Sequence, residues 1–518
     1  MAFVATSIFS CTSGFDNINQ DPYGVTKDEA SRDAYSEGAS MVAIQSWVVP
    51  TFPNAAQFTE ALLGGSWGGY LADSNPGFNG KNFATYRPEP GWNRVLFNDI
   101  IPNIYPYLSA LQALTDDEVL LSVAEVCKVA GVHRVTDAYG PIPYSKIGVD
   151  GELQAPFDSQ EDIYKTMIQE LTDAVDVLTI HKTGSFSPNA DKVYGGSVVN
   201  WIKFANSLKL RLAMRMVYAD EAAAQQYAEE AVNHEVGTMD TNADNALIGG
   251  FGKDGNPLHR IMYLWNDGDS RVSADITSVM NGYNDPRREK YFTVSTFTED
   301  DNVDSNGYFG IRSGINIPAG KTAQKYSNYN VTPSTPMLWM NAAEVAFLKA
   351  EGQLRGWNMG SGSARDFYEM GVKLSFDQWN ASDVEAYLVN SSNKPASYKD
   401  PLNRNSYSGA TSNATIAWED GAEFEYNLEQ IITQKWIANF PLGLESWAEY
   451  RRTGYPKLMP VVVNNSGGTV SSSEGPSRLA YPAEEISTNG PNVQQAITDY
   501  LKGPDNMATH VWWDKKNK

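Results

Sequence analysis

Residues 198–216 read VVNWIKFANSLKLRLAMRM. Apolar side chains recur along this segment at steps of three or four residues, with basic side chains between them. The apolar stripe consists of Trp201, Phe204, Ala205, Leu208 and Leu212. This spacing matches the 3.6-residue period of an α-helix that buries one face. The segment therefore predicts a long amphipathic helix.

The same spacing recurs along most of the chain. We expect further helices over residues 28–47, 92–114, 116–130, 158–178, 222–232, 340–357, 364–379, 427–440 and 492–501. Pro102 and Pro106 predict breaks in the second of these helices. Ser159 and Asp162 have the spacing of an N-terminal cap. Several helices come as adjacent pairs, which indicates helical-hairpin repeats, although no period of about 34 residues is visible.

Long stretches rich in Gly, Asn, Ser and Tyr separate these helices. They span residues 64–91, 249–273, 296–335 and 401–419. Loops of this length in a compact protein usually carry function. We therefore expect irregular loops to form the ligand face.

The charge balance limits the class of ligand. The 518 residues include 40 Lys and Arg against 62 Asp and Glu, a net charge of −22. Such a charge argues against nucleic acid and against a polyanion held by bulk charge, and it leaves open a neutral ligand, a cation or a basic partner. There is no run of about 18 apolar residues, so no membrane-spanning helix is expected.

The two cysteines, Cys11 and Cys127, are too few for a disulfide framework or a four-thiolate zinc site. Cys127 lies in an apolar helical pattern and is expected to be buried. Cys11 follows MAFVATSIFS, a short apolar run that ends in a small residue. This resembles the end of a bacterial lipoprotein signal and predicts lipidation of Cys11.

These features predict the domain organisation. Residues 1–10 are expected to be the remainder of a lipoprotein signal, and residues 11–28 a lipid-anchored tether. Residues 29–518 are expected to form a single domain, a helical scaffold with loop insertions near 64–91, 249–335 and 401–419.

No catalytic motif is complete. Gly320-Lys321-Thr322 resembles the end of a phosphate-binding loop, but Gly314 is one residue too far upstream and no apolar strand precedes it. None of the five histidines pairs with another at a spacing of four residues, so zinc chemistry is not expected. We expect no catalytic residues, no metal and no cofactor.

One segment resembles the start of a calcium loop. Asn302, Asp304, Asn306 and Gly307 fit its positions one, three, five and six, but position twelve is Ser313 instead of Glu. A polar turn is the favoured interpretation, and a structural calcium ion is the alternative.

Several segments, taken together, carry a resemblance to a known family. They are 134–145 (RVTDAYGPIPYS), 194–196 (YGG), 201–211 (WIKFANSLKLR), 284–287 (NDPR), 344–351 (EVAFLKAE), 434–438 (QKWIA), 445–456 (ESWAEYRRTGYP) and 478–482 (RLAYP). In this order they resemble the SusD/RagB-type outer-membrane nutrient-binding lipoproteins, in the SusD-like branch. The match runs from about residue 11 to residue 485, nearly the whole chain.

The resemblance implies a mainly α fold, with about four tetratricopeptide-like helix pairs as scaffold and long irregular loops as the ligand face. It implies a non-enzymatic, surface-exposed lipoprotein, lipid-anchored in the outer membrane. Such a protein captures oligosaccharides and delivers them to a SusC-like TonB-dependent transporter. Two alternatives stay open: a lid that binds peptides or other oligomers for such a transporter, and an all-α glycoside hydrolase.

The charged residues of these segments predict scaffold contacts. Lys203, Asn206, Lys209 and Arg211 are spaced around the helix that also carries the apolar stripe. We expect these residues to form ion pairs or cap hydrogen bonds with Glu344, Glu351, Glu445 or Glu449 on other helices, which would set the register between helices.

Loop aromatic residues are the candidates for the ligand site, because flat rings suit the C–H face of a sugar and Asn or Asp suits its hydroxyls. From the first loop the candidates are Trp67, Tyr70, Phe83 and Tyr86 for stacking, with Asn79 and Asn82 for hydroxyls. From the middle loops they are Trp265, Asn266, Asp267, Tyr308, Tyr326 and Tyr329. The alternative is that these rings attach the loops to the helices.

Overall fold

The computed structural model describes residues 35–149, 154–303, 305–409 and 412–516. The predicted signal remainder, the tether and Cys11 lie outside these residues. The longer helices are α3 (Tyr35–Val48), α6 (Val95–Leu114), α7 (Glu118–Tyr139), α8 (Gln160–Ile180), α9 (Val198–Arg215), α10 (Glu221–Val232), α12 (Ala274–Gly282), α14 (Ala342–Leu354), α15 (Ala364–Gln378), α17 (Phe424–Ala438) and α18 (Gly443–Thr453). No helix in this part of the chain is long and apolar enough to cross a membrane.

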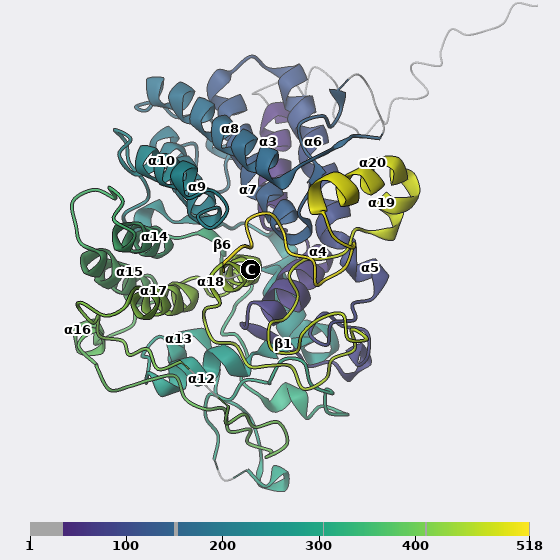
Figure 1. Ribbon diagram of the computed structural model, residues 1–518, viewed down its shortest axis with the longest axis vertical. Coiled ribbons are helices and arrows are strands. Elements are labelled where there is room, and N and C mark those ends of the chain that lie inside the picture. Colours follow the sequence, from purple (N-terminus) through teal and green to yellow (C-terminus); the bar gives the residue numbers. More distant parts are fainter. Residues whose placement is uncertain (1–34, 150–153, 304, 410–411, 517–518) are drawn as a thin grey trace, which may run out of the picture.

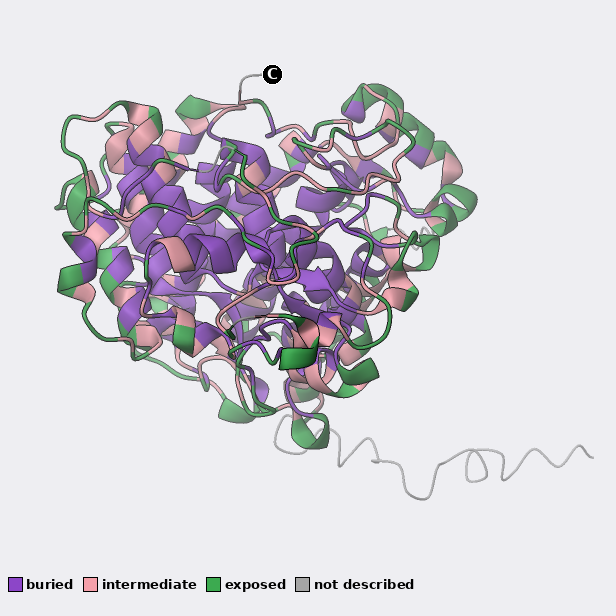
Figure 2. Ribbon diagram, turned by 90° about the horizontal axis from the view of Figure 1, so that it is seen from below, coloured by how far each residue is buried: buried purple, intermediate pink, exposed green. Residues whose placement is uncertain are grey.

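The helices pack as consecutive pairs. Helix α3 packs on α6, α7 on α8, α9 on α10 and α14 on α15, and contacts of α8 with α9 and of α14 with α17 join the pairs (Figure 1). Seen from below, the centre of the molecule is buried and exposed residues lie on the periphery (Figure 2). The stripe residues Trp201, Phe204 and Leu208 are at most 1% exposed. The predicted mainly α, helix-pair scaffold is confirmed.

Two local expectations have opposite outcomes. The backbone N–H of Asp162 donates to Ser159 Oγ at 3.1 Å, so the predicted cap is confirmed. The predicted breaks at Pro102 and Pro106 are wrong, because α6 continues through both prolines. Both prolines lie on the exposed side of α6, where water can bind the carbonyl groups that lose their helical partners.

Among the described residues there are three short two-stranded antiparallel sheets, two of which connect segments that are far apart in sequence. They pair β1 (Leu71–Asp73) with β5 (Ser270–Val272), β2 (Ile142–Pro143) with β3 (Phe157–Asp158), and β4 (Ala246–Ile248) with β6 (Met337–Met340). In the first sheet, Leu71 lies opposite Val272 and Asp73 opposite Ser270. This pairing brings the first of the expected ligand loops against the middle loops.

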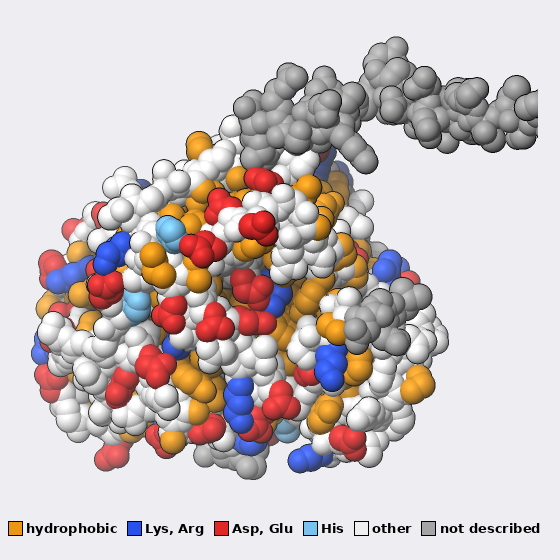
Figure 3. Space-filling view, turned by 90° about the horizontal axis from the view of Figure 1, so that it is seen from above, with side chains coloured by type: hydrophobic (Ala, Val, Ile, Leu, Met, Phe, Trp, Pro, Cys, Tyr) orange, Lys and Arg blue, Asp and Glu red, His pale blue; other side chains and the backbone are white. Residues whose placement is uncertain are grey.

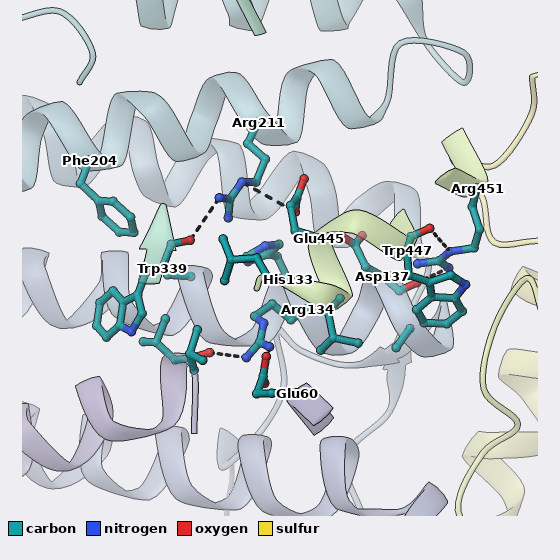
Figure 4. Close-up of a pocket in the computed structure, with 16 residues that line it drawn as sticks. Glu60, His133, Arg134, Asp137, Phe204, Arg211, Trp339, Glu445, Trp447 and Arg451 are labelled. Atoms are coloured by element: carbon teal, nitrogen blue, oxygen red, sulfur yellow. Dashed lines mark hydrogen bonds and ion pairs between the residues drawn. The ribbon is translucent and has the colours of Figure 1, made fainter. Parts of the chain in front are cut away.

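Ion pairs between helices cross the interior, and the prediction is confirmed for Arg211 alone among its four residues. The Arg211 guanidinium donates to both oxygens of Glu344 at 2.7 Å, and Arg215 pairs with Glu445. Arg211 Nε also lies 3.7 Å from the Glu445 carboxylate (Figure 4). Arg452 donates to both oxygens of Glu351, also at 2.7 Å.

Other members of this set find different partners. Lys203 pairs with Asp240 and Asp244, and Lys209 with Glu230, so these two lysines bind acids outside the expected set. On the face seen from above, acidic side chains lie among uncharged and hydrophobic ones, in keeping with the negative net charge (Figure 3).

The buried carboxylates predict the acid sensitivity of the fold. Burial alone would raise the pKa of Glu351 and Glu445, but the charges of Arg452 and Arg215 outweigh burial and lower both pKa values to about 2. The unfolded chain has glutamate pKa values of about 4.3. The stabilisation is therefore present above about pH 4.3 and is lost as the pH falls towards 2. Denaturant unfolding at successive pH values checks this; a free energy of unfolding that stays constant from pH 5 to 2 would contradict it.

Candidate functional site

The loop of residues 264–269, the Trp265 loop, has an unusual backbone. Asn266, Asp267 and Gly268 have successive φ angles of 53°, 60° and 111°. Asn and Asp tolerate the left-handed region better than other residues with a side chain. The ring of Trp265 is half-buried, whereas Asn266 and Asp267 are exposed. Backbone of this kind persists only where surrounding groups enforce it.

The first enforcing group is the buried side chain of Arg271 in β5. Its guanidinium donates to the backbone carbonyls of Asp267, Ser270, Met262 and Gln324, at 2.9, 2.9, 3.1 and 3.2 Å. Burial lowers the pKa of Arg271 to about 10, against smaller opposing effects of nearby acidic groups. The charge of this arginine is thus used to fix the path of the loop backbone.

The second enforcing group is the carboxylate of Asp269, which accepts hydrogen bonds from three segments. Gln57 Nε2 donates to Oδ2 at 2.6 Å, and both Asn75 Nδ2 and Asn266 Nδ2 donate to Oδ1 at 2.8 Å. Gln57 begins the π-helical turn Gln57–Gly65. One carboxylate therefore joins this turn, the loop after β1 and the Trp265 loop.

Further amides and hydroxyls brace the surrounding loops. Ser74 Oγ donates to the Gly268 carbonyl at 2.7 Å, and Gln324 Nε2 donates to the same carbonyl at 3.3 Å. The Asn79 carboxamide binds both the N–H and the carbonyl of Ile317, at 2.8 and 3.0 Å. The loops around residues 74–79, 264–269 and 317–324 therefore form one braced surface.

This surface carries exposed charges and rings. Lys321 forms an ion pair with Asp267 at the rim of the Trp265 loop. Phe58, Phe78 and Trp92 are each half-buried and form an aromatic cluster, with ring centroids 5.2 Å apart for Phe58 and Trp92 and 5.0 Å apart for Phe78 and Trp92. Two of these rings come from segments that the Asp269 carboxylate joins.

Asp73 lies behind this surface, at the end of β1. The side chain is buried, and its Oδ2 atom has no hydrogen-bond partner among the described residues. Burial is the largest cause that raises its pKa, to about 7; the negative charge of Asp269 adds to the effect, and a hydrogen bond from Ser66 opposes it. Ionisation of Asp73 would place two carboxylates next to each other beneath the loops.

Seven of the predicted site residues are buried, so the prediction that they form an exposed sugar platform is wrong. These residues are Trp67, Tyr70, Asn82, Phe83, Tyr86, Tyr326 and Tyr329, all at most 6% exposed. Two of them donate hydrogen bonds inside the protein: the Trp67 indole donates to the Phe83 carbonyl at 2.8 Å and the Tyr70 hydroxyl to the Trp436 carbonyl at 2.5 Å. These rings attach loops to helices, which is the alternative stated for them above.

Four of the remaining predicted residues come together. Trp265, Asn266 and Asp267 form the Trp265 loop, and Asn79 braces the neighbouring loop through Ile317. Tyr308 lies elsewhere, half-buried beneath the guanidinium of Arg288, 4.9 Å from the ring centroid.

Sequence reasoning missed the residues that shape the site. These are Gln57, Asn75, Asp269, Arg271, Lys321 and Gln324. The available signal was the triplet Asn266-Asp267-Gly268, a typical turn sequence next to a tryptophan.

The charged interior shown in Figure 4 is scaffold rather than a ligand site. Its cavity has a volume of about 20 Å³, room for about one water molecule. Arg134 donates to the Val48 carbonyl at 2.6 Å and pairs with Glu60. Burial, reinforced by the charge of Arg211, lowers the pKa of His133 to about 3, so this imidazole is neutral at pH 7.

The calcium alternative stays a prediction. Asp304 lies outside the described residues, and the Asn306 carboxamide oxygen accepts hydrogen bonds from Phe297 N and Ser295 Oγ, at 2.8 and 3.0 Å. Among the described residues, no cluster of three or more His, Cys, Asp or Glu side chains could hold a metal ion.

We predict that Gly268→Ala destabilises the protein more than Gly250→Ala does. Both glycines have positive φ, 111° and 77°, but an added Cβ at Gly250 meets open space, whereas at Gly268 it meets the Arg271 guanidinium. Gly250→Ala should cost about 1–2 kcal/mol, and Gly268→Ala should cost more because the added Cβ also meets the Arg271 guanidinium and the Met262 carbonyl. Denaturant unfolding measures both; equal losses would contradict the role assigned to Arg271.

We also predict that Asp73→Asn stabilises the protein at neutral pH. Because the folded-state pKa is raised, wild type is stabilised fully only below about pH 3.9, the pKa of an unfolded aspartate, and loses this stabilisation as the pH rises to 7. The Tm advantage of the variant should therefore grow between pH 4 and 7 and then level off. An advantage that does not change with pH would contradict the assignment.

Comparisons with known proteins agree with this fold. Residues 17–514 match the family model described as SusD-like, Susd and RagB outer membrane lipoprotein. Similar solved structures include a SusD homologue from Bacteroides uniformis, with 47% identity, TM-score 0.89 and coverage of 93% of this chain and 100% of that one. Another is a SusD homologue from Bacteroides ovatus, with 44% identity, TM-score 0.88 and coverage of 93% and 100%.

A third similar structure is a chitin-binding SusD homologue from Flavobacterium johnsoniae, with 36% identity, TM-score 0.86 and coverage of 92% of this chain and 98% of that one. A comparison with curated protein sequences found no match. Taken with the helix-pair scaffold and its braced loop surface, the family match over nearly the whole chain establishes that this protein belongs to the SusD-like family of outer membrane lipoproteins.

Proposed function

We propose that this protein is a cell-surface glycan-binding lipoprotein that captures oligosaccharides on the surface around the Trp265 loop. The observation that carries this proposal is the half-buried Trp265 ring, held on a loop that Arg271 and Asp269 constrain, with exposed Asn266 and Asp267 beside it. A braced ring binds a sugar face without losing much conformational freedom, and amide and carboxylate groups beside it suit sugar hydroxyls.

Family membership and the chitin-binding relative support a carbohydrate ligand. A neutral glycan fits best, because the site's exposed lysine, Lys321, is already paired with Asp267 and the net charge of the protein is −22. The glycan is bound without bond cleavage.

The wider role follows the family. Cys11 carries the lipid anchor in the outer membrane, and a SusC-like TonB-dependent transporter accepts the captured oligosaccharide. The family description as outer membrane lipoproteins supports the anchor. The scaffold pairs helices through buried ion pairs and so holds the ligand face rigid above such a partner.

We predict that Trp265→Ala weakens glycan binding while the fold persists. Loss of one stacked ring should raise the Kd about 2- to 12-fold, the equivalent of about 0.5–1.5 kcal/mol, and more if buried area is also lost. Chito- and manno-oligosaccharides that score on a glycan array are the probes, with calorimetry as the measurement. Trp418→Ala is the matched control, because Trp418 is also half-buried but packs on Tyr368 of α15.

Unchanged affinity in Trp265→Ala, with the fold intact, would refute the site. Two other outcomes would favour the alternative functions: binding of a peptide library in place of glycans, or new reducing ends after incubation with glycans.

A further inference from the structure

A polar hollow at the end of α18 belongs to no site discussed so far. Its wall consists of the end of α18, the loop of residues 468–477 and residues of the segment 508–516, and its volume is about 590 Å³. This volume is in the range of small-molecule binding sites. The hydroxyl groups of Thr469, Ser471 and Ser473 come from exposed residues of the wall. We call this hollow the α18 groove.

One residue of the groove wall, Lys516, is held in the way that a ligand site holds an ammonium group. Its Nζ donates to Glu425 Oε2 at 2.7 Å and to the Thr453 carbonyl at 3.0 Å. The same Nζ lies 5.1 Å from the ring centroid of Tyr455 and 5.7 Å from that of Tyr218. Thr453 is the last residue of α18, where the helix dipole favours a cation. We call these four residues the Lys516 site.

Contacts that do not involve Lys516 hold the walls of the Lys516 site. The Tyr455 hydroxyl donates to Glu425 Oε2 at 3.1 Å, and Arg355 Nη2 donates to the Tyr218 hydroxyl at 3.1 Å. Removal of the Lys516 side chain therefore leaves the carboxylate and both rings with partners that position them. A site positioned in advance binds a second ammonium group at a small cost in conformational freedom.

The Lys516 site can be reached from the α18 groove. Lys516 and Thr453 both line the groove, and the Glu425 side chain is 52% exposed. An incoming ammonium group can therefore replace that of Lys516 while the rest of the ligand lies in the groove. Arg451, another basic residue of the wall, is buried and donates to two backbone carbonyls, whereas the acidic Glu474 is exposed.

We propose that the Lys516 site is a second binding site, which accepts the lysine side chain of a partner protein in exchange for Lys516, with the neighbouring residues of the partner in the α18 groove. The site holds an unbranched alkylammonium group in this structure, so a second lysine fits the same geometry. The net charge of −22 attracts a basic partner. A glycan without amino groups has no cation for these acceptors, so the proposal does not depend on the Trp265 loop.

The first test uses n-butylammonium, which has the alkyl chain and the charge of a lysine side chain. Calorimetry should show saturable binding to Lys516→Ala, and binding to wild type at least tenfold weaker because Lys516 competes. The uncharged 1-butanol should bind Lys516→Ala at least tenfold more weakly than n-butylammonium does. Absence of saturable n-butylammonium binding to folded Lys516→Ala, or equal binding of 1-butanol, overturns the proposal.

Two further variants locate the site. Glu425→Gln, added to Lys516→Ala, should weaken n-butylammonium binding at least tenfold. Lys457→Ala is the matched control, because Lys457 Nζ also lies over the Tyr455 ring, 4.7 Å from its centroid, but its removal leaves Lys516 in the site. This control should bind n-butylammonium as weakly as wild type does. Unchanged affinity in the double variant, or tight binding to Lys457→Ala, overturns the proposal.

A measurement on the wild-type protein tests the partner and needs no variant that might fail to fold. The probe is an acetylated glycine pentapeptide with a central lysine, and the control peptide has norleucine in its place. In amide hydrogen exchange, the lysine peptide should slow exchange in residues 469–475 and speed it in residues 511–516. The norleucine peptide should change neither segment. Equal exchange with both peptides overturns the proposal.

Discussion

Buried backbone carbonyl groups need hydrogen-bond donors, and loops without regular secondary structure supply only part of them from their own backbone. This constraint shapes the surface around the Trp265 loop, the proposed ligand face of this protein. The Arg271 guanidinium donates hydrogen bonds to four backbone carbonyls, those of residues 262, 267, 270 and 324, and so fixes the path of the Trp265 loop. The Asp269 carboxylate accepts hydrogen bonds from three side-chain amides and so joins three segments.

In the scaffold, ion pairs between buried side chains hold the helices together. Arg211, Arg215 and Arg452 are buried between helices, and each has a glutamate partner from another helix. Such pairs are weak evidence for added stability, but breaking one of them leaves an uncompensated charge. Each buried arginine must lie opposite its glutamate, so the ion pairs allow only one register between the helices. The loops are therefore attached to a rigid support.

The helices could be predicted from the sequence because their signals are local. The stripe on α9 and the cap at Ser159 depend on residues three or four positions apart. The orientation of the loop aromatics could not, because it depends on distant partners: the Tyr70 hydroxyl binds the carbonyl of Trp436, 366 residues away. A ring in a Gly- and Asn-rich loop has the same local sequence whether it faces solvent or a helix.

Side-chain type alone makes the Trp265 loop a candidate site. It does not identify the residues that hold the loop, because Asp269 and Arg271 act through backbone atoms and amides that no motif specifies. Pro102 and Pro106 show the reverse case, a strong local signal that tertiary packing overrides. Because both prolines are exposed, α6 continues through them, and the apolar residues on the opposite face of the helix stay buried.

The most direct test of this account is amide hydrogen exchange with and without a bound oligosaccharide. The account predicts slower exchange on binding in residues 74–80, 264–268 and 317–324, with little change in the paired helices. Protection confined to another surface, with these three segments unchanged, would contradict it.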